Sequence, residues 1–463
     1  MTKEQREKLL YQPKNGYDRL TKDEEAELNA YCEAYKAFLN RSKTERECVV
    51  SAVELAEKAG FRELTAGMAL KAGDKVYSVN RGKSILLAVI GKKPLSEGAN
   101  IGAAHTDAPR LDFKPNPLYE DAELAYIKTH HYGGIRKYQW VTVPLELHGK
   151  IVRADGSEVY VKIGADPEDP QFVINDLLPH LGREQNQKKL PDAITAENLN
   201  VVLGSLPIAD ADAENRIKLS ILGLLNEMYG ITERDFVTAE IEIVPAFKAR
   251  DVGLDRSMIG AYGHDDRVDA YPALMAEIEV QHPAHTTVCI LTDKEEVGSD
   301  GVTGMNSMYA YHFLQQLCAA TGVDSIAAFQ ASKCLSADVT AAYDPSFSEA
   351  FEPDNGTYAG RGVAIYKYTG AGGKSSTSDA NAELVSYLTR LMNKNGVVWQ
   401  IGEMGRLDLG GGGTIAKYVA NRDIDTIDIG VPVLAMHSPF EVVSKADVYM
   451  AYRTFRAFCA DAE

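Results

Sequence analysis

Long apolar runs are missing from this sequence. It has no stretch of about 18 apolar residues, which is the length that a helix needs to span a bilayer. Residues 1–7 also lack the apolar core of a secretory signal. We therefore expect no membrane span and no export, which predicts a cytoplasmic location.

Cysteine and positive charge are also sparse. The six cysteines are scattered and form no Cys-x-x-Cys pair, which fits a reducing compartment and argues against a thiolate zinc site. The 49 basic residues are outnumbered by 66 acidic ones, and the resulting net charge of −17 argues against nucleic acid or an anionic membrane as a partner. An acidic excess is compatible with metal binding.

The length and texture of the chain indicate two domains. A chain of 463 residues exceeds one ordinary domain. Between residues 112 and 244, strand-like pieces at 141–147 and 159–163 and one amphipathic helix at 213–229 are separated by long polar connections, at 115–121, 167–171 and 183–193. We interpret residues 112–244 as an inserted, mainly β domain, and residues 1–111 with 245–463 as the main domain. The alternative is that the insertion decorates the main fold.

Strands and helices alternate in the rest of the chain. Helices are predicted at residues 21–39, 42–60, 268–280, 305–320, 379–393 and 445–460. Strands are predicted at residues 76–79, 84–90, 100–104, 286–291, 324–331, 361–368, 397–403, 426–431 and 433–436. This alternation predicts an α/β fold, with a mostly parallel sheet, helices on both of its faces, and ligands at the carboxyl ends of its strands.

Two adjacent carboxylates, Glu295 and Glu296, follow the apolar and β-branched run at residues 286–291. Like charges at the end of a buried strand repel each other in a partly dry environment, which is costly. A divalent metal ion would offset this cost, with one carboxylate as its ligand and the other facing the substrate to move protons. The alternative is an exposed loop pair.

Four further polar groups stand at predicted strand ends or helix starts: His105 with Asp107, Asp265 with Asp266, Asp338, and His437. His105 and Asp107 are two residues apart, so they share a face of an extended chain, and Asp107 can hold the imidazole of a metal-binding His105. Taken singly, each group also has a structural interpretation, such as a helix cap or a hydrogen-bonded histidine. Together they form a mixed nitrogen and oxygen donor set, which suits two ions of zinc, cobalt or manganese in a hydrolytic site.

These motifs resemble a known family. The segments 104–110, 265–267, 293–299, 336–338 and 436–439 are closely similar to those of the aspartyl aminopeptidase and vacuolar aminopeptidase I family of dinuclear zinc exopeptidases. The resemblance implies a metal-dependent aminopeptidase that releases single N-terminal residues from peptides. It implies a cis bond between Asp265 and Asp266, and these roles: His105, Glu296, Asp338 and His437 as metal ligands, Asp265 as the bridging ligand, Glu295 as the general base, and Asp107 as the residue that orients His105.

The resemblance also concerns the insertion, which in the family dimerises and builds a hollow tetrahedral dodecamer. His180, in the apolar segment 177–181, would then reach the active site of a neighbouring subunit, where it would stabilise the oxyanion of the tetrahedral intermediate or ligate a metal ion. The alternative is a structural histidine of the dimer interface.

Substrate preference stays open between acidic and neutral N-terminal residues. Lys374 is expected either to pair with an acidic substrate side chain or to lie solvated on the surface, and Met436 is expected to contact the substrate. Two other functions are compatible with the sequence. One is a carboxypeptidase or amide deacylase on a related dinuclear scaffold, and the other is a non-catalytic shell or cargo-binding protein of the same fold.

Overall fold

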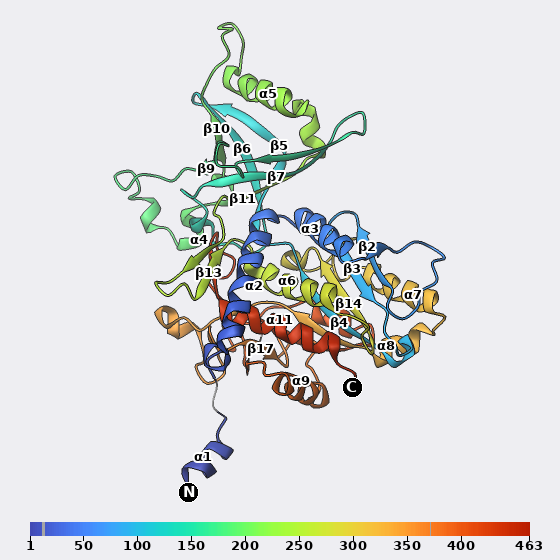
Figure 1. Ribbon diagram of the computed structural model, residues 1–463. Helices are drawn as coiled ribbons and strands as arrows, with labels where there is room; N and C mark the ends of the chain where they lie inside the picture. Colours follow the sequence, from blue (N-terminus) through green and yellow to red (C-terminus); the bar gives the residue numbers. More distant parts are fainter. Residues whose placement is uncertain (12–13, 371) are drawn as a thin grey trace. The chain divides into compact units, whose positions relative to one another are not determined.

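Apolar runs form the middle of the largest sheet in the computed structural model of the chain, which describes residues 1–11, 14–370 and 372–463 (Figure 1). The described residues divide into two units. The first consists of Met1–Asp107, Ala249–Met436 and Glu441–Glu463, and the second of Ala108–Lys248 and His437–Phe440.

The main sheet of the first unit has nine strands within the described ranges, in the order β1-β2-β3-β14-β4-β15-β19-β17-β18. The four strands β14, β4, β15 and β19 run parallel to one another, which confirms the mostly parallel sheet. β4 and β14 are buried along their whole length, as strands covered on both faces must be. The strands span Arg62–Glu63 (β1), Lys75–Asn80 (β2), Ser84–Val89 (β3), Thr286–Thr292 (β14), Ala99–His105 (β4), Lys333–Ala337 (β15), Asp425–Gly430 (β19), Val363–Tyr366 (β17) and Trp399–Ile401 (β18).

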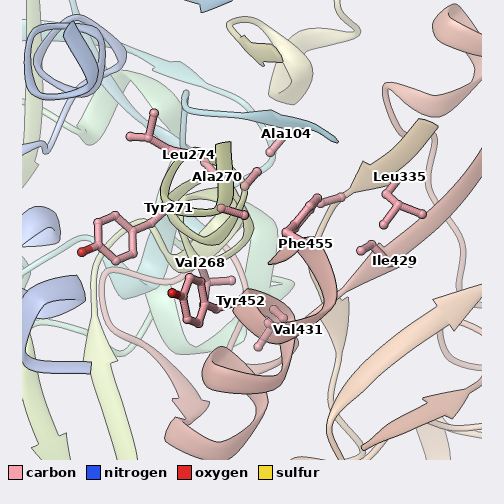
Figure 2. Packing of buried hydrophobic residues seen from close by; sticks show 14 of the residues in the cluster. Ala104, Val268, Ala270, Tyr271, Leu274, Leu335, Ile429, Val431, Tyr452 and Phe455 are labelled. Carbon is pink, nitrogen blue, oxygen red and sulfur yellow. The ribbon is translucent and has the colours of Figure 1, made fainter. Parts of the chain in front are cut away.

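Helices pack against both faces of this sheet. Core residues of α2, α3, α6, α9 and α11 form a cluster with one face, and core residues of α7, α8 and α10 form a cluster with the other. Figure 2 shows α6 and α11 packed together on the first face, and Gly102 of β4 leaves room there for the ring of Phe455 from α11. The helices span Lys3–Leu9 (α1), Lys22–Arg41 (α2), Glu45–Lys58 (α3), His264–Glu279 (α6), Tyr309–Thr321 (α7), Ser325–Ala331 (α8), Ala382–Lys394 (α9), Ala416–Ala420 (α10) and Lys445–Ala460 (α11).

A smaller sheet of the first unit has the strand order β12-β13-β21-β20-β16. Its central strand β21 brings Glu441 beside the strand that precedes α6. The strands span Arg250–Val252 (β12), Met258–Ala261 (β13), Glu441–Ser444 (β21), Pro432–Leu434 (β20) and Thr340–Ala341 (β16).

The second unit is built on an antiparallel sheet whose described strands lie in the order β8-β7-β11-β5-β6-β10-β9. Its apolar side chains and the helix α5 (Arg216–Tyr229) line a cavity of about 180 Å³. The strands and the short helix α4 span Glu158–Ile163 (β8), Leu145–Val152 (β7), Glu240–Pro245 (β11), Arg110–Asp121 (β5), Leu124–Tyr132 (β6), Val201–Gly204 (β10), Val173–Ile174 (β9) and Leu190–Ala193 (α4).

The structure corrects two predicted elements. Residues 324–331, predicted as a strand, contain the helix α8, because the side chain of Asp324 accepts the N–H of Ile326 and caps its start. The strand is β15, directly afterwards, so Asp338 still follows a strand. Residues 115–121, predicted as a polar connection, lie in β5, whose prolines fall where its pairing with β6 shifts register. Within the described part of the chain, no helix has the length and apolarity needed to cross a membrane.

Candidate metal and catalytic site

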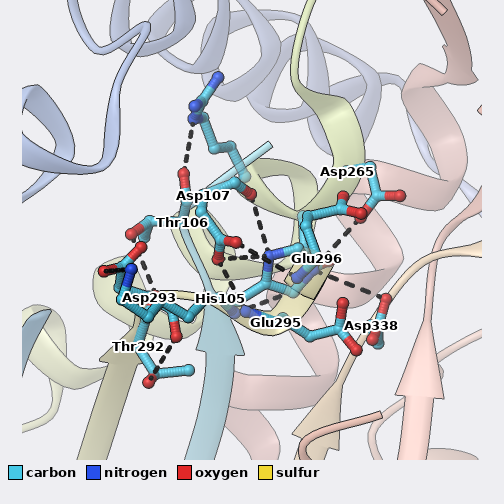
Figure 3. Close-up of polar contacts among 12 residues, drawn as sticks. His105, Thr106, Asp107, Asp265, Thr292, Asp293, Glu295, Glu296 and Asp338 are labelled. Carbon is cyan, nitrogen blue, oxygen red and sulfur yellow. Dashed lines mark hydrogen bonds and ion pairs between the residues drawn. The ribbon is translucent and has the colours of Figure 1, made fainter. Parts of the chain in front are cut away.

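His105 is the last residue of β4, and its side chain is fully buried. Its Nδ1 lies 3.0 Å from the carbonyl oxygen of Asp107 and 3.3 Å from Oδ1 of the same residue, so the Nδ1–H donates to Asp107. Nε2 consequently faces Oδ1 of Asp265, at 3.2 Å, and Oδ1 of Asp338, at 3.8 Å (Figure 3). Among the described residues, Nε2 has no hydrogen-bond partner. This is the orientation of a metal-binding histidine that is held through its other nitrogen.

Asp265 and Asp338 are held by their backbones. The N–H of Asp265, near the start of α6, donates to Oε2 of Glu441 at 3.1 Å, and its bond to Asp266 is cis, as expected. The N–H of Asp338, just after β15, donates to the carbonyl of Ile429 at 2.9 Å. Gly430 passes so close that a Cβ there would lie 1.7 Å from the carbonyl oxygen of Asp338, so only glycine fits at that position.

Glu295 and Glu296 form a single 3₁₀ turn, η7 (Glu295–Val297), at the end of β14. β14 pairs in parallel with β4, and Thr292 stands opposite His105, so the two strands end side by side. The N–H groups of Glu295 and Glu296 donate to the two carboxylate oxygens of Asp107, each at 3.2 Å. Asp107 therefore holds both the imidazole of His105 and this turn (Figure 3).

The charges of the site favour a bound cation. Burial opposes protonation of His105, but the carboxylates of Asp107, Asp265 and Asp338 outweigh it and hold the pKa of the imidazole well above its usual value. Burial, followed by the charge of Asp338, raises the pKa of Glu295 to about 8. Without a cation, His105 and Glu295 retain protons that they would otherwise release near neutral pH.

The donor set fits divalent metal ions. His105, Asp265 and Asp338 each offer a ligand atom, and these atoms lie within 4.8 Å of one another, as do ligand oxygens of Asp265 and Glu296. Asp265 is shared by both groups. An imidazole nitrogen with carboxylate oxygens is a donor set that zinc, cobalt and manganese accept, and the buried Nε2 of His105 points at the two carboxylates that would share an ion with it.

Met436 and His437 are adjacent in sequence. Met436, the last residue of its segment of the first unit, is partly buried against the main core. His437 begins the segment His437–Phe440, which groups with the second unit, and its Nδ1 donates to the carbonyl of Gly134 of that unit at 2.7 Å. This hydrogen bond puts the proton on Nδ1 and makes Nε2 the nitrogen that can ligate a metal ion.

The other two predicted site residues, His180 and Lys374, are described by their own local contacts. His180 is exposed in a turn of the second unit, with Leu177, Leu178 and Leu181 also exposed around it. Lys374 is half exposed, with its Nζ 3.1 Å from Oδ2 of Asp379 and 3.8 Å from the centre of the Tyr368 ring.

Two buried residues support the site although the sequence analysis predicted no role for them. Glu441 accepts the N–H of Asp265. A carboxylate as the first residue of the valine-rich strand β21 was the signal that could have indicated a buried polar role for it. Arg267 is 1% exposed and donates to the carbonyls of Thr106 and Lys43, which fixes the chain just after His105. No local sequence signal indicates that these distant carbonyls converge on Arg267.

The chain is similar to known proteins over most of its length. The model of the family described as "Aminopeptidase I zinc metalloprotease (M18)" matches residues 38–459. The "Probable M18 family aminopeptidase 1" of Clostridium acetobutylicum is 46% identical over 458 residues, which cover 97% of this chain and 98% of that protein. The crystal structure of an M18 family aminopeptidase from Thermotoga maritima has a TM-score of 0.93 and 43% identity, covering 97% of this chain and 99% of its own. The mApe1 dodecamer of S. cerevisiae shares the fold, with a TM-score of 0.75 at 20% identity, over 92% of this chain and 95% of its own.

Proposed function

The chain belongs to the aminopeptidase I zinc metalloprotease family (M18), and we propose that this metal-dependent aminopeptidase holds two divalent ions at the carboxyl ends of β4, β14 and β15. His105 and Asp338 would bind one ion, Glu296 and His437 the other, and Asp265 would bridge the two. The single observation that carries this proposal is that Asp265 belongs to two groups of closely spaced ligand atoms. Zinc is the ion that the family description names, and cobalt and manganese accept the same donors.

Bound ions would act as Lewis acids: they would polarise the scissile carbonyl, lower the pKa of water and accept the lone pair of the neutral N-terminal amine. Glu295 is the general base: it takes a proton from the attacking water and delivers it to the departing amine. The backbone carbonyl and the carboxylate of Asp107 keep the Nε2 atom of His105 directed at Asp265 and Asp338, and the carboxylate also fixes the turn that carries Glu295. One N-terminal residue leaves per cycle.

Metal analysis of two variants tests the bridging role of Asp265. After dialysis against chelator and reloading, the wild type should bind two zinc ions per chain by mass spectrometry of the metal. Asp338→Asn should weaken the binding of one ion, so the zinc content of this variant should fall toward one ion per chain. Asp265→Asn should weaken the binding of both ions, so its zinc content should fall further. Equal metal contents in these two variants would rule out Asp265 as the bridge.

The second unit would form the dimer, and dimers would assemble into a tetrahedral dodecamer. The exposed leucines around His180 and the dodecameric mApe1 support this proposal. His180 would then act in the site of the neighbouring subunit, as a donor to the oxyanion or as a ligand.

The substrate contacts remain proposals of the same kind. Lys374 would pair with an acidic side chain at the peptide N-terminus, where it would exchange its present contact with Asp379. Met436 would contact the substrate beside His437. The six cysteines, all thiols and all buried, support a cytoplasmic location.

A further inference from the structure

Residues 293–304 form a closed loop that carries Glu295 and Glu296, with its two ends tied together. Asp293, the residue after β14, forms a parallel bridge with Gly304, and its N–H donates to the carbonyl of Thr303 at 3.4 Å. The strongest tie is between side chains: the hydroxyl of Thr303 donates to Oδ2 of Asp293 at 2.6 Å.

This contact is deeply buried. Asp293 is 1% exposed and Thr303 is 4% exposed. A buried carboxylate requires donors, and an O–H···O⁻ hydrogen bond of this length is among the stronger kinds. The Nζ of Lys294 is farther away, at 3.9 Å from the same oxygen, so the Thr303 hydroxyl makes the shorter contact.

Thr303 is anchored to the main sheet. Its carbonyl accepts the hydroxyls of Ser84, at 2.8 Å, and Thr292, at 3.1 Å. The preceding carbonyl, of Val302, accepts the side-chain amide of Asn80 at 2.7 Å. Since Asn80 and Ser84 belong to β2 and β3, the Thr303 hydroxyl has a position that the sheet determines.

The turn between these ends has little conformational freedom. The backbone of Lys294 has a left-handed conformation, with φ at 71°, and its carbonyl accepts the N–H of Ser299 at 2.7 Å. On the other side, Asp107 accepts the N–H groups of Glu295 and Glu296. The backbone of the turn that carries Glu295 is therefore held from two sides: by Asp107, and by the Asp293–Thr303 pair.

We propose that Thr303 is a positioning residue for Glu295 and Glu296, acting through the carboxylate of Asp293. The hydroxyl fixes Asp293, Asp293 sets the start of the turn, and the turn places one carboxylate to move protons and the next to bind metal. This inference rests on the general-base role proposed for Glu295.

Thr303→Val removes the hydroxyl and keeps the shape, and Thr303→Ser restores the donor. The chain offers a matched control at the opposite end of β14: the buried hydroxyl of Thr287 donates to Oε1 of the buried Glu277 at 3.0 Å. Thr303→Val and Thr287→Val should both lower the melting temperature, because each leaves a buried carboxyl group without its hydroxyl donor. At saturating metal and peptide, only Thr303→Val should lower kcat, by about 10- to 100-fold with KM changed less than about threefold, because a small misplacement of a catalytic group is costly.

Amide hydrogen exchange gives a readout that does not depend on activity. In metal-loaded Thr303→Val, residues 294–299 should exchange faster, with no change in Thr287→Val, and Thr303→Ser should restore both exchange and kcat. Wild-type kcat in folded Thr303→Val, or an equal loss of kcat in Thr287→Val, would overturn the inference. If Thr303→Val does not fold, Thr303→Cys tests the same contact with a weaker donor, and a kcat equal to wild type would again overturn it.

The failure of this inference is distinguishable from the failure of the proposed mechanism. Glu295→Gln tests the base directly. An inactive Glu295→Gln beside a fully active Thr303→Val would refute only the positioning role. A fully active Glu295→Gln would refute the base, whatever Thr303→Val does.

Discussion

At the scale of single residues, Asp107 connects the two halves of the chemistry. One carboxylate contacts the Nδ1 of His105 and the N–H groups of Glu295 and Glu296. A shift of this side chain would therefore move His105, the proposed metal ligand, and Glu295, the proposed general base, together. Such shared control would keep their spacing constant, which a hydrolytic site requires.

Glu295→Gln isolates the proton-transfer step. The amide retains the shape of the side chain but cannot accept a proton, so kcat should fall by about 10²- to 10⁴-fold. Metal content, measured by mass spectrometry, should stay at the wild-type value because no ligand is lost. Glu296→Gln is the contrast, because it should lower metal content as well. Near-normal turnover of a metal-loaded Glu295→Gln protein would remove Glu295 from the role of base.

Individual site residues could be predicted because each follows a strand end or opens a helix. The sequence brought His105, Asp265 and Asp338 into one hypothesis, and the structure brings their ligand atoms together. Contacts such as the N–H of Glu295 to Asp107 could not be predicted, because they depend on the register that sets Thr292 opposite His105. Register between strands nearly 200 residues apart is a tertiary property that local patterns do not encode.

At the scale of elements, α6 links the site to the core. Its first turn carries Asp265, and almost all of its side chains are buried, many of them in the core that α6 forms with α11 and the main sheet. Near its other end, Glu277 is 1% exposed and accepts the hydroxyl of Thr287. Burial raises the pKa of Glu277 from 4.5 to about 8.

Glu277 should make stability fall as pH rises. Between pH 4.5 and about 8 the folded state retains a proton that the unfolded state releases, so its contribution decreases through this window and is lowest above it. Glu277→Gln keeps an acceptor for Thr287 and has no charge to bury. Its gain in unfolding free energy over wild type should grow from pH 5 to pH 8.5, by about 1–3 kcal/mol. Urea unfolding at both pH values measures this, with exposed Glu63→Gln as control, and a gain independent of pH would contradict it.

Helices and strands were predicted best where a single hydrophobic pattern, that of a helix or of a strand, dominated the segment. The apolar runs of β4 and β14 and the capped helices α2 and α3 fall close to their predicted places. The strand predicted at 324–331 was wrong because the apolar residues 326–329 belong to a short helix that Asp324 caps, and the strand β15 begins directly after it. β5 and β6 were missed because their many polar side chains and the prolines of β5 resemble a loop.

At the scale of the whole molecule, the insertion separates the first metal motif from the second. The chain leaves the first unit after Asp107, directly beyond the residue that orients His105, and returns at Ala249. His180 lies within that excursion, on an exposed apolar turn. An apolar turn of this kind is costly in water and favours burial in an assembly.

Mixing two inactive variants tests whether subunits share a site. If the imidazole of His180 donates to the oxyanion, His180→Ala should lower kcat by raising the activation free energy by about 2–4 kcal/mol. When His180→Ala and Glu295→Gln proteins exchange subunits, some sites receive His180 from one chain and Glu295 from the other, so peptide hydrolysis should partly return. Exchange is checked by mass spectrometry of differently labelled chains. If the subunits exchange and no activity returns, His180 acts within its own subunit or has only a structural role.

The separation of the donors also has a consequence for biosynthesis. His105 and Asp338 are more than 200 residues apart, which a ribosome translates in roughly 10–50 s. Asp265 and Glu296 are translated within that interval, but the proposed donors follow different strands and come together only when the main sheet has formed. An ion would then find no complete site that could template folding, unlike in a zinc finger, whose ligands are close in sequence. We expect the first unit to fold before it takes up its ions. The amount of active enzyme in a cell would then depend on the supply of metal after translation, and a cell starved of metal would accumulate folded protein that awaits activation.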